Sequence, residues 1–166
     1  WIVANLHLSG FPQEGFGVPL AWDNVLYDSP GLGYVVATHQ LIRRRLPGTV
    51  LTYYRALADQ NPVAWRLQLL ALPREAWAHA ILDDLSGPHP EIRQRVTRLD
   101  VFRYGHAMCR PTPGSIWGER RKLLADYSGP RLILAHADLS GFSIFEEAQY
   151  RGVLAAERLL KRLVRS

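Results

Sequence analysis

A single carboxylate near the end of the sequence lies where it could contact a cofactor. Asp138 follows the apolar residues 131–135 and precedes an amphipathic stretch over residues 142–164. The apolar run predicts a short buried strand, and the periodicity of the longer stretch predicts a helix. A carboxylate between a strand and a helix can accept hydrogen bonds from sugar hydroxyls, while the free N–H groups of the first helical turn face electron-rich oxygens. This pattern favours a polyhydroxylated, anionic cofactor.

The residues around Asp138 form a recognisable series. Residues 134–138 read Leu-Ala-His-Ala-Asp, residues 144–148 read Ile-Phe-Glu-Glu-Ala, and residues 151–156 read Arg-Gly-Val-Leu-Ala-Ala. The series resembles the C-terminal flavin motif of FAD-dependent amine oxidoreductases, a family that includes phytoene desaturases and protoporphyrinogen oxidases. The matching residues are Asp138, Ala148, Gly152, Ala155 and Ala156, whereas His136 and Glu147 stand where the family usually has glycine. The alternative is an ordinary C-terminal helix on a sheet, whose small residues only permit close approach.

A second segment extends the resemblance. In the family, a strand that ends shortly before a Pro-Gly turn brings side chains against the flavin ring, and Pro113-Gly114 matches that turn. Cys109 does not stand at the position of a flavin-attachment cysteine, so the resemblance implies non-covalent FAD. His106 is implied to lie near the ring, with a structural histidine as the equal alternative. The cofactor-binding residues implied in this way are Asp138, Ile144, Phe145, Ala148 and His106, and no catalytic residue is implied.

The resemblance also implies a reaction, which is hydride transfer from an organic substrate to the flavin N5. Amine oxidases of this family often place two aromatic rings above the flavin, and the matching positions here are Ala107 and Ile144. The missing rings weaken the case for an amine. A small organic substrate, apolar or amine, is therefore expected, and the cofactor would supply the chemistry.

One element of the family is missing from the sequence. The ADP half of FAD is bound by a strand, a Gly-x-Gly-x-x-Gly turn and a helix, and no such run occurs. The nearest approach, Gly15-Phe16-Gly17, is followed by Val18-Pro19, where a helix cannot begin as required. The sequence also begins at Trp1 rather than Met. We therefore expect a C-terminal part of a longer flavoprotein that lacks the N-terminal FAD domain, is inactive alone, and binds FAD weakly or not at all.

The rest of the sequence predicts the elements that would carry these residues. Pro-Gly pairs at residues 30–31 and 47–48 predict type II turns between strands, and Asn61-Pro62 predicts a helix start. Strands followed by helices favour an α+β fold, with a mostly antiparallel sheet, flanking helices and a C-terminal strand-helix returning to an FAD-binding domain. Residues 1–108 would form the substrate-binding domain and residues 109–166 the C-terminal segment of the FAD-binding domain. The predicted strands cover residues 2–8, 21–27, 33–38, 49–54 and 96–104, and the helices residues 63–72 and 74–85.

The composition of the chain argues against several other classes of function. The formal net charge is +5. The basic residues form only two short clusters, at residues 43–45 and 120–122, so nucleic acid is not expected as a partner. The single cysteine makes a reducing compartment the default and so favours the cytoplasm. There is no apolar run of transmembrane length, and the six histidines do not have metal-ligand spacings. The alternative function is a free-standing α+β binding or interaction module with a basic face and no catalysis.

Overall fold

The chain folds into two compact units. The computed structural model describes residues 1–15, 19–40, 46–127, 129 and 131–164. The first unit comprises Trp1–Gly105 and the second His106–Ser166. This division lies close to the boundary predicted between residues 108 and 109. That the two units correspond to a substrate-binding domain and a flavin-domain segment stays a prediction.

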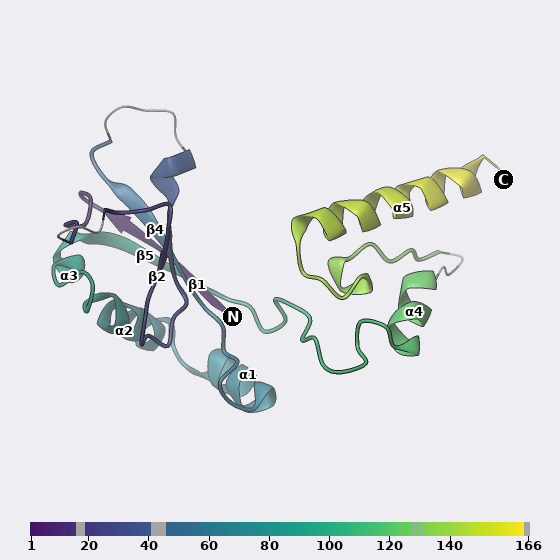
Figure 1. The fold of residues 1–166 in the computed structure, drawn as a ribbon, viewed down its shortest axis with the longest axis horizontal. Helices are drawn as coiled ribbons and strands as arrows, with labels where there is room; N and C mark the ends of the chain where they lie inside the picture. The colour runs from purple at the N-terminus through teal and green to yellow at the C-terminus, as the bar shows by residue number, and fades with distance from the viewer. Residues whose placement is uncertain (16–18, 41–45, 128, 130, 165–166) are drawn as a thin grey trace. The chain divides into compact units, whose positions relative to one another are not determined.

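The N-terminal unit is drawn in purple to teal in Figure 1. It is built on an antiparallel sheet of five strands, in the order β2-β3-β4-β1-β5. Four of them lie within the stretches in which the sequence predicts strands, although β2 and β3 are shorter than expected. The fourth strand of the chain, β4, runs one residue beyond its predicted end, to Arg55. The α+β class and the mostly antiparallel sheet are therefore confirmed. The strands are β1 (Ile2–Leu8), β2 (Asp23–Val25), β3 (Gly33–Val36), β4 (Thr49–Arg55) and β5 (Val96–Arg103).

One face of this sheet forms the core of the unit. Alternate residues of β1, from Ile2 to Leu8, are buried, as its period-two pattern predicts. Three helices contribute buried side chains to the same apolar cluster: α1 (Pro62–Ala71), α2 (Arg74–Leu85) and α3 (Ile92–Arg95). The helical members of the cluster are Trp65, Leu69, Trp77, Ile81, Leu85 and Ile92.

The helix starts follow local sequence signals. The side chain of Asn61 accepts hydrogen bonds from the backbone N–H groups of Val63, at 2.9 Å, and Ala64, while Pro62 occupies the first helical position. Helix α2 begins at Arg74 and ends at Leu85, the bounds that the sequence predicts. A short 3-10 helix, η1 (Ala37–Gln40), follows β3.

The two Pro-Gly turns are not type II turns. Type II needs a positive φ at the glycine, and neither Gly31 nor Gly48 has one. The chain reverses instead around Asp28, which takes a φ of 55°. Gly48 leads directly into β4, where an added Cβ would lie 2.1 Å from the backbone oxygen of Leu8. The predicted turn types are therefore wrong, because the close approach of a neighbouring strand decides the backbone there.

The C-terminal unit contains helices and irregular segments. It has helix α4 (Glu119–Asp126), the 3-10 helix η2 (Ala137–Leu139) and the long helix α5 (Phe145–Leu163). The strand predicted over residues 131–135 is wrong, since Ile133 alone makes an isolated bridge and Leu132 is 55% exposed. A strand is stabilised by the hydrogen bonds of a neighbouring strand, and the described part of this unit holds none.

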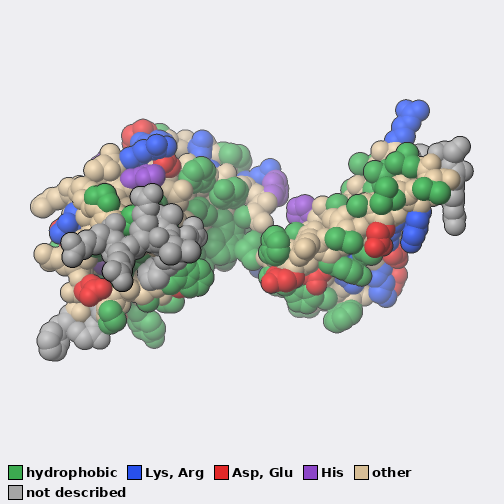
Figure 2. Space-filling model, turned by 90° about the horizontal axis from the view of Figure 1, so that it is seen from above, with side chains coloured by type: hydrophobic (Ala, Val, Ile, Leu, Met, Phe, Trp, Pro, Cys, Tyr) green, Lys and Arg blue, Asp and Glu red, His purple; other side chains and the backbone are tan. Residues whose placement is uncertain are grey.

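Helix α5 begins later than predicted and presents much of its apolar surface to solvent. Gly141, with a φ of 78°, and the extended backbone of Ile144 delay the helix to Phe145. No residue of α5 is buried among those described, and Figure 2 shows apolar side chains at the surface of this unit. Arginines connect α5 to the rest of the unit. Arg151 donates to the carbonyl of Leu139, and Arg158 donates to the carbonyl of Ala125.

Candidate functional site

A hollow in the C-terminal unit brings together two segments that the sequence singles out separately. Its volume is about 510 Å³. One wall is formed by the loop from Cys109 to Ser115 and by the start of α4, and the other includes Asp138 and Gly141. The structure thus brings Asp138 and the Pro113-Gly114 turn to the same hollow.

The carboxylate of Asp138 is accessible within η2. The backbone N–H of Asp138 donates to Nδ1 of His136 at 3.1 Å, and the same nitrogen lies 3.5 Å from Asp138 Oδ2. A ring nitrogen that accepts this N–H has no proton to give to the carboxylate. Asp138 is half-exposed, so its carboxylate remains able to accept hydrogen bonds from a ligand. His136 acts here as the N-cap of η2.

Two arginines hold the turn that carries Asp138. Arg121 Nη1 and Arg151 Nη2 donate to the backbone oxygen of Leu139, at 2.8 and 3.2 Å. Arg151 Nε also donates to the hydroxyl of Ser140, at 2.8 Å. The sequence gives no sign of the contact made by Arg121, because the carbonyl that it meets is 18 residues away in the chain.

The start of α5 is tied to the loop on the opposite side of the hollow. The backbone N–H of Cys109 donates to Oγ of Ser143 at 3.0 Å, and Cys109 Sγ lies 3.3 Å from the same hydroxyl. Ile144, the N-cap of α5, makes no side-chain capping bond, and Phe145 is 75% exposed. The N-cap residue therefore leaves the N–H groups of the first turn without a side-chain cap, and Glu146 and Glu147 belong to the same turn.

The other cofactor-binding residues that the resemblance implies lie outside the hollow. Ile144 and Ala148 are exposed at the start of α5, although neither lines the hollow. His106 lies in an exposed turn after β5 and does not line the hollow either. The structure brings Asp138 and the 109–115 loop together, while His106 stays outside that group.

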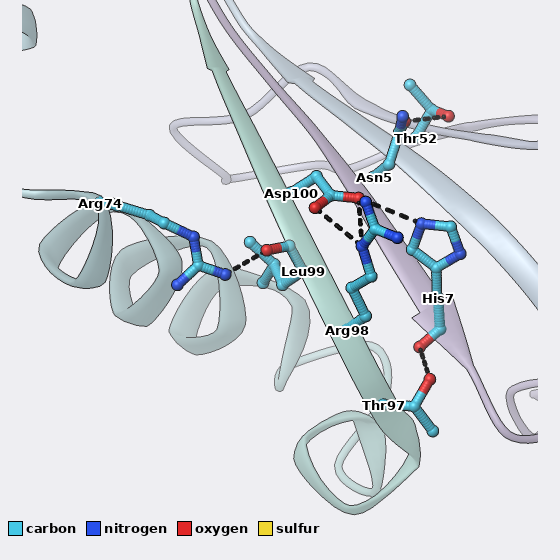
Figure 3. Close-up of polar contacts among 8 residues, drawn as sticks. All are labelled: Asn5, His7, Thr52, Arg74, Thr97, Arg98, Leu99 and Asp100. Atoms are coloured by element: carbon cyan, nitrogen blue, oxygen red, sulfur yellow. Dashed lines mark hydrogen bonds and ion pairs between the residues drawn. The ribbon is translucent and has the colours of Figure 1, made fainter.

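A second polar group lies on the sheet face opposite the core, and the sequence analysis missed it. His7 Nε2 lies 3.3 Å from Asp100 Oδ2, and Arg98 Nε lies 3.0 and 2.9 Å from the two oxygens of the same carboxylate (Figure 3). The hydrogen bond from Arg98, together with its charge, and the bond from His7 hold the pKa of Asp100 below its usual value. Beside this group, Thr52 donates to Asn5 at 2.9 Å. The alternation of β1 places His7 on this face, but only the pairing of β1 with β5 brings Asp100 to it.

In the described ranges, no three His, Cys, Asp or Glu side chains come together as metal ligands would. Nor does any helix in the same ranges combine the length and apolarity needed to cross a bilayer.

Searches against protein-family models, curated proteins and solved structures find no match for the chain.

Proposed function

We propose that this chain supplies the substrate-facing sheet and the C-terminal flavin contacts of an FAD-dependent oxidoreductase of the amine oxidase-like type. The observation that carries the proposal is the hollow in which Asp138 meets the 109–115 loop, with the start of α5 tied to that loop through Ser143. The sequence resemblance points to the same segments independently.

The proposed contacts to the ribityl and ring half of FAD come from one residue of the hollow and from the start of α5, which does not line the hollow. The half-exposed carboxylate of Asp138 would accept a hydrogen bond from a ribityl hydroxyl. The backbone N–H of Phe145, in a first turn without a side-chain cap, would donate to an electron-rich edge of the ring. A flavin held there without a covalent link would supply the chemistry, as a hydride acceptor at N5.

The uncovered sheet face is the proposed substrate surface. It presents Asn5, His7 and Thr52 on neighbouring strands, with partly exposed side chains. The substrate would be a small organic molecule, apolar or amine, as the resemblance implies. Ala107 and Ile144 stand where amine oxidases of the resembled family often carry aromatic rings, and they provide no cage for an amine.

The proposal also limits what the chain binds by itself. With no Gly-x-Gly-x-x-Gly turn in the sequence, the ADP half of FAD would make no specific contact with this chain. The affinity for FAD should then be close to the affinity for FMN, and weaker than micromolar.

Titration of the chain with FAD and FMN, followed by flavin fluorescence with ADP as a competitor, tests the proposal. We expect weak saturable binding of both flavins and no competition by ADP. Asp138→Ala should weaken binding by about tenfold, the cost of a hydrogen bond to a charged group. Asp126→Ala, at an exposed position at the end of α4, is the matched control and should change nothing.

Three results would overturn the proposal. One is submicromolar binding of FAD that ADP competes away. The second is an unchanged flavin affinity in Asp138→Ala. The third is the absence of saturable flavin binding at the highest concentration that the protein tolerates.

A further inference from the structure

A second hollow lies in the N-terminal unit, where β1 ends and β4 begins. Its volume is about 460 Å³. Most of its wall is apolar, and one wall residue, His7, carries an imidazole whose two ring nitrogens can donate or accept hydrogen bonds. The apolar part of the wall comprises Leu8, Ala37, Leu46, Pro47 and Val50.

The contacts of His7 fix which ring nitrogen carries the proton. Asp100 accepts a double contact from Arg98 and is held in its ionised form, so it can only accept a hydrogen bond from His7. The proton of the neutral ring therefore sits on Nε2, which lies 3.3 Å from the carboxylate. The other nitrogen, Nδ1, points away from Asp100 (Figure 3) and has its lone pair available.

The surroundings of the pair are those of a positioned base rather than of a freely solvated ion pair. The side chain of His7 is 39% exposed and that of Asp100 29%, so both are partly enclosed by the sheet. The backbone oxygen of His7 accepts the hydroxyl of Thr97 at 3.1 Å, which adds a second link between β1 and β5 beside the ring. A carboxylate that orients an imidazole and leaves one nitrogen open is a common arrangement for accepting a proton.

We propose that this hollow binds a small molecule with an apolar body and one protic group, whose O–H or N–H donates to His7 Nδ1. The apolar wall would take the body of the ligand, and the imidazole would fix its orientation. Asp100 acts as a positioning residue, since it holds the tautomer in which Nδ1 accepts. The proposal needs no flavin, so its failure and the failure of the proposed function are separate results.

The experiment compares two probes, of which one has a hydrogen-bond donor and the other has a methyl group in its place. Cyclohexylmethanol has an apolar ring and one hydroxyl, and its methyl ether has the same ring without the O–H. Both are titrated into the intact chain, and the imidazole nitrogens are followed by long-range ¹H–¹⁵N correlation spectra. We expect the alcohol to shift the Nδ1 signal of His7 and to bind about five- to tenfold more tightly than the ether, the difference that one hydrogen bond makes.

Three variants locate the effect. His7→Gln should remove the preference for the alcohol, and Asp100→Asn should reduce it, because an amide no longer fixes the tautomer. His79→Gln, at an exposed histidine of α2, should leave both affinities unchanged. Circular dichroism shows whether each variant is folded, and the two-probe comparison on the unaltered chain tests the proposal even if one variant is not.

The outcomes that would overturn the inference are equal binding of the alcohol and the ether, or no shift of His7 up to the solubility limit of the alcohol. A folded His7→Gln variant that keeps the preference would overturn it as well.

Discussion

The hydroxyl of Ser143 joins the two halves of the C-terminal site, because it accepts the backbone N–H of Cys109 at 3.0 Å and lies 3.3 Å from the Cys109 sulfur. These residues are 34 positions apart in sequence. The bond holds the 109–115 loop against the start of α5, and thereby determines the wall of the hollow that Asp138 completes.

Ser143→Ala should loosen this loop. Losing one net hydrogen bond of about 1 kcal/mol raises the population of locally open states about fivefold. The alkylation rate of Cys109, the only cysteine of the chain, should rise by a similar factor. The rate is measured with iodoacetamide and mass spectrometry, with Ser86→Ala in the other unit as the control. An unchanged rate in Ser143→Ala would mean that the bond does not hold the loop.

The backbone N–H of Phe145 can be removed without breaking the helix. Phe145 is the first residue of α5, a position that tolerates proline, and Ile144 before it is already extended. Phe145→Pro should therefore keep the helix but weaken flavin binding about tenfold, if this N–H donates to the ring. Phe145→Leu keeps the N–H and should change the affinity little. Equal affinities for the two variants, measured by flavin fluorescence, would contradict the assigned contact.

Asp84 is expected to be the most sensitive carboxylate of the N-terminal unit. It accepts the hydroxyls of Tyr53 and Ser29, each at 2.7 Å, and burial next to this carboxylate raises the pKa of Tyr53. Asp84→Ala leaves the buried Tyr53 hydroxyl without its acceptor and should cost about 1–3 kcal/mol of unfolding free energy. The neighbouring Asp83→Ala removes only an exposed ion pair with Arg93 and should cost about 0–1 kcal/mol. Urea unfolding measures both, and equal losses would show that the buried network contributes nothing particular.

The buried pair of Tyr34 and His89 should make the N-terminal unit sensitive to acid. The hydroxyl of Tyr34 lies 2.6 Å from Nε2 of His89, and burial holds the pKa of His89 below the usual value of 6.5. The unfolded chain then binds the proton more readily, so this contribution to stability is complete above about pH 6.5 and is lost as the pH falls further. His89→Gln should show a smaller loss of unfolding free energy between about pH 7 and pH 5. Parallel curves of unfolding free energy against pH for His89→Gln and the unaltered protein would show that His89 is not the source of the acid sensitivity.

Local sequence determined the elements whose signals lie within a few residues. The alternation of β1 gave its buried face, and Asn61-Pro62 gave the start of α1, because a cap and a fixed φ act on their immediate neighbours. The bounds of α2 followed from the same kind of signal. The α+β class could be predicted for this reason, and so could a long helix after Asp138.

Tertiary structure decided the features that depend on distant partners. An apolar run such as residues 131–135 becomes a strand only beside another strand, and Gly48 takes its conformation where the backbone of Leu8 approaches it. The same holds for the sites. His7 and Asp100 are 93 positions apart and meet because β1 pairs with β5. Asp138 lies beside the 109–115 loop in a turn that two arginines hold by the carbonyl of Leu139. Every residue carries a backbone carbonyl, so the residue types in the sequence do not specify which carbonyl an arginine contacts. The folded structure determines that contact.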